Sequence, residues 1–427
     1  MRRTPAIPTV LIWFAGASLG ADLPDAPKPP AGFPNFKVQE IDSGLKIGYA
    51  VITADIDGDG KPDIVVADQH KIVWYQNPTW KKRVLLDGKT KPDNVCLAAI
   101  DIDGDKLPEL VVGAGWKPFD TKNHGTLQWL KRGKTLDDEW TMHAIPCDEP
   151  MVHRVRLIDT DGDGKPEIVM APLMGRDATK EKNWMDGRPV RILSYKVPAK
   201  DPEKPENWKP TVISEELHVV HNFCAFSERE GMPVLAASYE GVTLLYKRGD
   251  KWVGVRKGAG DQRNPTGSRG TSEVKMVSLG QALERDKLPF CFPTIEPWHG
   301  QQFVVYSMQV AGDKLWDRYV IDDRMRWGHA LGHADFDGNG SEEIVVGVRD
   351  NPDPKLGDTF TEKRGVRIYR NTDGKGAKWE RYILEDGGVA VEDRTVADLD
   401  GDGKPDIIAV GRATGNCRIY WNKGVAK

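Results

Sequence analysis

Short runs of alternating apolar and polar residues recur along the chain, separated by turns rich in glycine and aspartate. The stretch from Trp379 to Trp421 contains one complete set of these runs. Alternation at 379–384, 394–399, 407–410 and 417–421 predicts four short strands in about forty residues. Four antiparallel strands in a segment of that length are typical of one blade of a β-propeller.

An acidic loop follows the second strand of this set, and four further copies of the loop occur earlier in the chain. Their first aspartates are 46, 58, 176 and 63 residues apart, and 176 is about three times 58. Two units between the third and fourth loops therefore lack the loop, which gives seven units. The acidic positions of the five loops are Asp55, Asp57, Asp59 and Asp63; Asp101, Asp103, Asp105 and Glu109; Asp159, Asp161, Asp163 and Glu167; Asp335, Asp337, Asn339 and Glu343; and Asp398, Asp400, Asp402 and Asp406.

An aromatic residue marks the strand before each unit and gives the same count. In four units the aromatic residue stands 19 residues before the first loop aspartate. The seven markers are Phe36, Trp80, Trp140, Trp208, Trp252, Trp316 and Trp379. The chain ends before a fourth strand of the last blade, whereas the run at Phe36 matches the run at Trp379. We therefore expect an all-β, seven-bladed propeller over residues 36–424, closed by an N-terminal strand that completes the last blade.

Composition supports this architecture and limits the partners. The chain has 427 residues with 44 Gly and 29 Pro, which favours short strands and tight turns over long helices. The formal net charge of -4 provides no basic field for nucleic acid, so we expect no nucleic-acid partner. The five cysteines are odd in number and scattered, and we expect no disulfide framework.

The N-terminus has the pattern of an exported protein. Two arginines precede a short apolar run, and small residues follow it near Ala21. This pattern predicts a signal peptide over residues 1–21, a Pro-rich spacer over residues 22–35 and a secreted or periplasmic protein. The apolar run is too short for a good membrane span, so we expect none in the mature chain.

The acidic loops have the chemistry of calcium ligands. Carboxylates at positions 1, 3, 5 and 9 gather hard oxygen atoms around one point, and glycines permit the tight turn. Five copies at the blade period favour structural Ca²⁺ ions over a calcium sensor. Lys106 and Asn339 depart from the pattern locally. The loops resemble FG-GAP or VCBS repeats, which implies an integrin-like propeller whose ligands bind on the face opposite the loops.

That opposite face receives the start of each inner strand. Six residues before each loop position stand Tyr49, Val95, His153, His221, Glu273, His329 and Glu392. Three imidazoles with one or two glutamates can bind a divalent transition metal such as Zn²⁺ or Mn²⁺ and leave a position open for substrate. Polar side chains that only meet water in the channel are the alternative.

Loops between the second and third strands should form the walls of this funnel. They provide the substrate-binding candidates Trp116, His124, Tyr239, Arg349 and Arg412, with Trp298 and His299 nearby. Aromatic rings beside arginines suit a sugar, although solvated loops have a similar composition.

The last hundred residues carry a closer resemblance. Trp327-Gly-His-Ala, Gly388-Val-Ala-Val-Glu-Asp-Arg and Gly411-Arg-Ala-Thr are similar to the propeller of the aldos-2-ulose (anhydrofructose) dehydratases. The resemblance implies a carbohydrate substrate and metal-assisted elimination from a keto sugar or keto glycoside. His221, Glu273, His329 and Glu392 would then hold the metal, His153 would act as base, and Arg154 or Arg394 would orient substrate. The roles of the three histidines are interchangeable at this level. A non-catalytic propeller that binds glycan or protein is the competing hypothesis.

Overall fold

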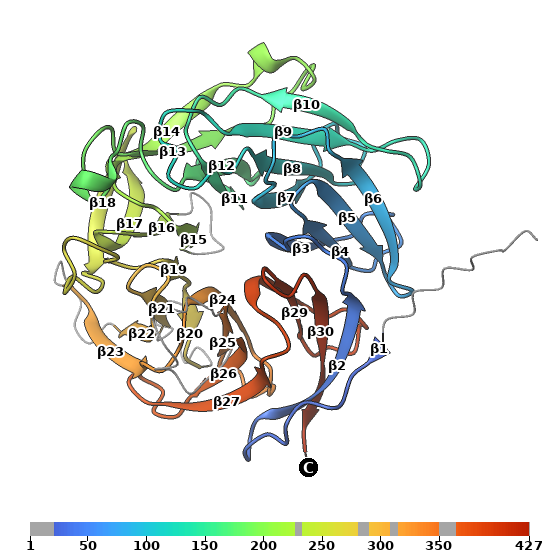
Figure 1. Ribbon diagram of the computed structural model, residues 1–427, viewed down its shortest axis with the longest axis vertical. Coiled ribbons are helices and arrows are strands. Elements are labelled where there is room, and N and C mark those ends of the chain that lie inside the picture. Colours follow the sequence, from blue (N-terminus) through green and yellow to red (C-terminus); the bar gives the residue numbers. More distant parts are fainter. Residues whose placement is uncertain (1–20, 227–232, 281–289, 308–314, 350–363, 427) are drawn as a thin grey trace, which may run out of the picture.

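The computed structural model describes residues 21–226, 233–280, 290–307, 315–349 and 364–426. Seven antiparallel sheets surround a central axis, as predicted (Figure 1). The predicted signal peptide lies outside the described residues except for Ala21. Among the described residues, no helix has the length and apolar character needed to cross a membrane.

Each sheet runs from an inner strand at the axis to an outer strand at the rim (Figure 1). The inner strands are β3 (Ala50–Ala54), β7 (Cys96–Ile100), β11 (Val152–Ile158), β15 (Asn222–Ala225), β19 (Glu273–Val274) with β20 (Val277–Ser278), β24 (Gly328–Ala334) and β28 (Val391–Ala397). The second strands are β4 (Asp63–Ala67), β8 (Glu109–Ala114), β12 (Glu167–Pro172), β16 (Val234–Ser238), β21 (Phe290–Glu296), β25 (Glu343–Val348) and β29 (Asp406–Gly411).

The third and outer strands complete the blades. The third strands are β5 (Lys71–Gln76), β9 (Thr126–Lys131), β13 (Val190–Tyr195), β17 (Gly241–Arg248), β22 (Gln302–Ser307), β26 (Gly365–Asn371) and β30 (Cys417–Val425). The outer strands are β6 (Lys81–Asp87), β10 (Thr141–Ile145), β14 (Pro210–Leu217), β18 (Lys251–Gly258), β23 (Asp317–Asp322), β27 (Trp379–Asp386) and β2 (Pro34–Asp42). The aromatic markers lie in these outer strands or up to two residues before them. Two single-turn 3₁₀ helices, Lys180–Lys182 and Pro205–Asn207, lie in loops of the third blade.

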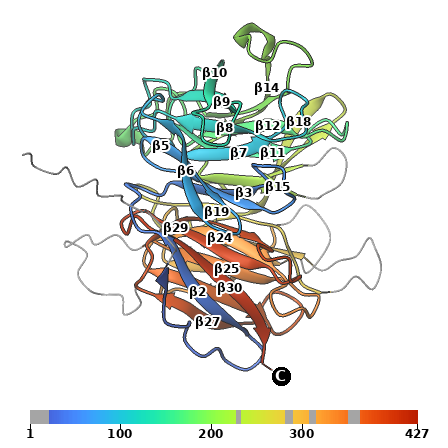
Figure 2. The ribbon, with the colours of Figure 1, turned by 90° about the vertical axis from the view of Figure 1, so that its right-hand side faces the viewer.

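The ring closes through the N-terminal strand, as predicted. β2 pairs antiparallel with β30, and both views show the two strands side by side (Figures 1 and 2). β1 (Ala21–Asp22) adds a fifth strand outside β2. Residues 22–35, predicted as a spacer, pack on the last two blades. Phe33 is buried, and the Tyr382 hydroxyl donates a hydrogen bond to the Pro27 carbonyl.

The inner strand of the fifth blade is interrupted. β19 and β20 both pair with β21, and the gap between them lies opposite Pro293. Proline has no backbone N–H to donate to the ladder, which explains the break. Lys275 lies in this gap.

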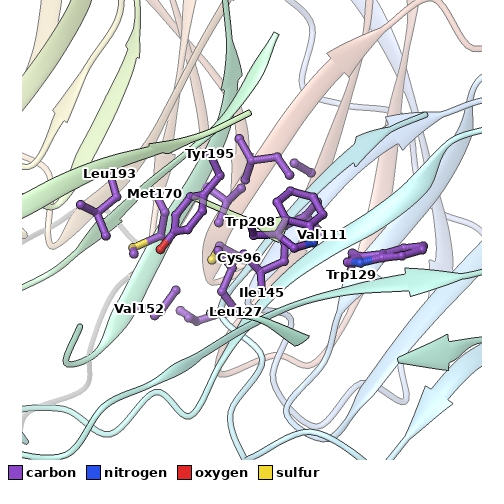
Figure 3. Packing of buried hydrophobic residues seen from close by; sticks show 14 of the residues in the cluster. Cys96, Val111, Leu127, Trp129, Ile145, Val152, Met170, Leu193, Tyr195 and Trp208 are labelled. Carbon is purple, nitrogen blue, oxygen red and sulfur yellow. The ribbon is translucent and has the colours of Figure 1, made fainter. Parts of the chain in front are cut away.

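Apolar side chains fill the space between neighbouring blades. Seven buried clusters each join two adjacent blades, and together they cover all seven interfaces. Between the second and third blades, Trp129 and Val111 face Met170, Tyr195 and Trp208 (Figure 3). The five cysteines are free thiols, and Cys96, Cys291 and Cys417 are fully buried within this packing.

Candidate metal centre in the funnel

Three histidines converge near the propeller axis. His221 immediately precedes β15, His329 is the second residue of β24, and His299 lies in the loop between β21 and β22. Each offers a ring nitrogen, and the three nitrogens lie within 4.8 Å of one another. The Nε2 atoms of His221 and His299 are 2.9 Å apart. Two ring nitrogens at that distance fit either a shared proton or a shared metal ion.

The outer nitrogens of two of these rings are fixed by hydrogen bonds. His221 Nδ1 lies 3.0 Å from the Ser272 carbonyl oxygen, and His329 Nδ1 lies 2.5 Å from the Glu392 carbonyl oxygen. A carbonyl only accepts, so each Nδ1 carries the proton and each Nε2 presents a lone pair. Histidines that ligate metals are held in this way in known sites.

Electrostatics keep the three imidazoles neutral. Burial is the main cause that lowers the pKa of His221 and holds the pKa values of His299 and His329 well below their usual range. Arg349 adds to the lowering for His299 and His329. Neutral imidazole is the form that binds metal, and three histidines with an open position are typical of catalytic zinc sites. The donor set therefore fits a divalent transition metal.

The two glutamates of the predicted metal set lie beside these rings, outside the three-histidine group. Glu273 Oε1 is 3.1 Å from His221 Nδ1, on the side of the ring away from His299. Burial disfavours its charge, but the hydrogen bond to His221 lowers its pKa. Glu392 accepts hydrogen bonds from Arg349 (2.8 Å) and Arg412 (3.0 Å), and its Oε1 is 3.9 Å from His329 Nε2. Glu273 is thus placed to orient the metal-ligand candidate His221. Glu392 lies near enough to His329 to act as a metal ligand itself.

The predicted catalytic residues divide between two cavities. The His153 ring is 4.8 Å from the His221 ring and lines the funnel. Its Nε2 accepts a hydrogen bond from Arg154 at 3.2 Å, and its buried Nδ1 has no partner among the described residues. Burial and then Arg154 hold the pKa of His153 well below its usual range. Arg154 and Arg394 line a second cavity further along the channel.

The funnel is a cavity of about 970 Å³ above the three histidines. Trp116, Trp298 and Trp327 provide aromatic wall surface, and Arg349 and Arg412 place guanidinium groups on the same wall. Burial disfavours the charge of Glu392, but these two arginines outweigh that effect and lower its pKa. Aromatic faces beside charged hydrogen-bond donors suit a sugar ring with its hydroxyl groups.

Two predicted substrate contacts are not among the funnel residues. His124 is exposed and its ring nitrogen contacts the Gly125 carbonyl oxygen. Tyr239 is buried in an apolar cluster with Leu173 and Met174 behind the wall. Trp116, Arg349 and Arg412 are in the funnel, as the sequence pattern indicated.

His299 entered the sequence interpretation only as a wall residue. The spacing of six residues before each loop marks the starts of inner strands, whereas His299 comes from a turn between the second and third strands. Only five residues, Pro297 to Gln301, separate β21 from β22. A turn this short keeps its residues close to the strand ends. Its length was therefore the signal in the sequence that could have placed His299 near the funnel.

The acidic loops lie at the other end of the inner strands. Asp159, Asp161, Asp163 and Glu167 bring one oxygen each within 4.8 Å, and three further loops bring together positions 1, 3 and 9. Glu109, Glu167 and Glu343 each use Oε2 for a backbone N–H, while Oε1 is buried without a partner among the described residues. Asp63 and Asp406 use both oxygens for backbone N–H groups. The three orphaned oxygens fit a bound cation.

Comparison with known proteins agrees with the fold and the repeats. The model of the aldos-2-ulose dehydratase β-propeller domain matches residues 124–309. The FG-GAP-like repeat matches residues 55–112 and 335–409. Aldos-2-ulose dehydratase of Phanerodontia chrysosporium is 24% identical over 281 residues. That match covers 60% of this chain and 29% of the enzyme, so this chain corresponds to less than a third of the enzyme's length.

Solved structures resemble the whole ring. A chain in the crystal structure of the mitotic checkpoint complex has a TM-score of 0.54 at 11% identity, covering 97% of this chain and 99% of that chain. A chain in the crystal structure of BBS1N in complex with ARL6DN, soaked with mercury, has a TM-score of 0.50 at 14% identity, covering 96% and 99%. These two similarities show the fold alone. The chain is a seven-bladed β-propeller in which segments match the FG-GAP-like repeat and the propeller domain of aldos-2-ulose dehydratase.

Proposed function

We propose that this protein is a metal-dependent carbohydrate lyase of the dehydratase type, acting on a keto sugar or keto glycoside. The observation that carries the proposal is the group of three neutral imidazoles on the floor of a funnel with tryptophan walls. The similarity to aldos-2-ulose dehydratase supports the substrate class. The residues differ from the sequence-based set in that His299 joins His221 and His329.

His221, His299 and His329 would hold a divalent transition metal such as Zn²⁺ or Mn²⁺. Such an ion, when bound, acts as a Lewis acid that polarises a ketone and makes the neighbouring C–H more acidic. Arg349 and Arg412 bind and orient hydroxyl groups of the sugar, and Trp116 and Trp298 pack against its apolar face. These walls also exclude water from the reacting carbons.

His153 is the group we assign to proton removal. It is neutral and it lines the funnel beside His221. The Arg154 hydrogen bond must leave Nε2 before that nitrogen can accept the proton from the carbon next to the ketone. A C=C bond then forms as the β-carbon loses its C–O bond. The leaving oxygen takes the proton that His153 has accepted and departs as water or as an alcohol, which returns His153 to its neutral form.

Two further parts of the proposal concern the scaffold. Structural Ca²⁺ ions bind in the acidic loops. Three glutamate oxygens there, which are buried without a hydrogen-bond partner among the described residues, support this part of the proposal. The protein is exported through an N-terminal signal peptide and works outside the cytoplasm, a setting in which millimolar calcium suits exposed loops.

The test compares metal content and elimination in three proteins. After mild calcium chelation, the wild type and the control His124→Ala should each retain about one transition metal per chain. The double variant His221→Ala/His329→Ala should lose the metal while circular dichroism shows an intact fold. Keto sugars and 3-keto glycosides should give ultraviolet-absorbing enones with the first two proteins only. Calcium alone in all three proteins, without enone formation, would favour a non-catalytic propeller that binds glycan or protein.

A further inference from the structure

A second cavity lies along the central channel, beyond the three-histidine group. It has a volume of about 360 Å³, and residues of all seven blades line it. Val95 alone lines both this cavity and the funnel among the described residues. The proposed elimination does not use this space, so its chemistry needs a separate explanation.

The lining of this channel cavity carries an excess of positive charge. Its cationic residues are Arg154, Arg156, Lys275 and Arg394. Its carboxylates are Glu273 and Asp393, so four positive charges less two negative charges leave a formal charge of +2. Like charges enclosed together in a partly buried space repel one another strongly, because water screens them poorly there.

The two carboxylates are already engaged by neutral groups. Glu273 accepts hydrogen bonds from His221 and from the Asn222 amide, the latter at 2.7 Å. Asp393 accepts a hydrogen bond from the Val51 backbone N–H at 3.1 Å. Within the part of the chain that the structure describes, none of the four cationic side chains forms an ion pair. The two carboxylates therefore balance only part of the positive charge, and they do so without direct contact.

Arg394 has a buried N–H donor, Nε, that lacks a hydrogen-bond acceptor among the described residues. The side chain is held against Gly332, where an added Cβ would come within 2.4 Å of Nε. Burial lowers the pKa of Arg394 to about 10, and burial together with Arg394 and Arg156 lowers that of Lys275 to about 8. Burial is the main cause of both shifts, and Arg156 adds to each of them, whereas Asp393 and Glu273 oppose the lowering for Arg394.

We propose that the channel cavity binds a tetrahedral oxyanion of charge -2, such as sulfate or hydrogen phosphate. A dianion balances the formal charge of +2. Arginine N–H donors match the geometry of a tetrahedral oxyanion, and Lys275 adds a point charge. The anion would join strands β11 and β28 to the interrupted inner strand of the fifth blade, three parts of the ring that are far apart in sequence.

Calorimetric titration of the calcium-loaded full chain with sulfate tests this proposal, with chloride at equal ionic strength as reference. We expect saturable binding of about one sulfate per chain and a rise in melting temperature that chloride does not give. Arg394→Gln and Lys275→Gln should each weaken sulfate binding at least about tenfold, since each removes a charged hydrogen bond. Lys209→Gln, which removes an exposed charge outside the cavity, should leave the affinity unchanged.

Two outcomes would overturn the proposal. The first is that sulfate gives the same heat of titration and the same melting temperature as chloride. The other is sulfate affinity that falls equally in Lys209→Gln and in the two cavity variants. Inorganic phosphate and glucose 6-phosphate, titrated separately, identify the source of the oxyanion. Tighter binding of the ester identifies a phosphorylated sugar as the ligand, whereas equal or weaker binding of the ester identifies the free ion. Transition-metal content, measured in parallel, should be the same in all variants, which separates this site from the three-histidine group.

Discussion

Glu273 is a buried carboxylate that contacts His221, one of the three histidines of the candidate metal centre, on the side of the ring away from His299. It holds His221 through Nδ1, together with the Ser272 carbonyl. A carboxylate partner raises ligand basicity and fixes the ring, and its loss typically weakens metal binding by about 10- to 100-fold. We therefore expect Glu273→Gln to weaken transition-metal affinity by about that factor, measured by competition with a chelator of known affinity.

A matched control exists in the same chain. Glu240 contacts His218 Nδ1 at 2.8 Å in a histidine–glutamate pair that is not among the funnel residues. Glu240→Gln should leave metal affinity unchanged, and both variants should keep the wild-type circular dichroism spectrum. Equal metal affinity in Glu273→Gln and the wild type would show that the carboxylate has no role in orienting His221.

At the scale of single elements, the sequence predicted the strands that recur in each blade. It predicted few of the turns and breaks that depart from the repeat. The aromatic markers identified the outer strands because, in four units, the marker stands 19 residues before the first aspartate of the next acidic loop. Periodicity placed His221 and His329 at the starts of inner strands. It could not place His299, whose position depends on a turn. It also missed the break opposite Pro293, which depends on the partner strand across the sheet.

We expect calcium and pH to act on the same hairpins, those that carry the acidic loops. In the absence of metal, burial and then Asp337 raise the pKa of Glu343 from 4.5 to about 8. Between these two values the folded protein binds a proton that the unfolded chain has released. The free energy of unfolding of the calcium-free protein should therefore fall as pH rises from about 5 to about 8. Glu109, with its pKa raised to about 7 by burial, contributes in the same direction.

Melting temperatures measured across this pH range with a chelator present check the sign. Glu343→Gln should flatten part of the decline, and added Ca²⁺ should remove most of it because the ion stabilises the charged carboxylates. A melting temperature that rises with pH in the chelated wild type would contradict the assignment.

The whole ring depends on neighbours packing in sequence around the axis. Seven apolar clusters join adjacent blades, so each blade is held by the two beside it. The cluster between the sixth and seventh blades includes Phe33, Phe36 and Val38 from the N-terminal segment. The unpaired strand at the end of the chain made closure by β2 predictable. The packing of residues 22–35 was not predictable, because a proline-rich composition alone does not show whether a segment docks.

Closure by β2 is testable by shortening the chain in two steps. A chain that begins at residue 33 keeps Phe33 and β2, and should stay monomeric with a lower melting temperature. A chain that begins at residue 43 lacks β2 and exposes the edge of β30, whose backbone groups are then free to pair with another molecule. We expect this shorter chain to self-associate at micromolar concentration, as measured by light scattering. Adding a synthetic peptide of residues 33–42 should restore the monomer, because it supplies the missing strand. A chain from residue 43 that stays monomeric and melts like the longer one would show that six complete blades hold the ring without the N-terminal strand.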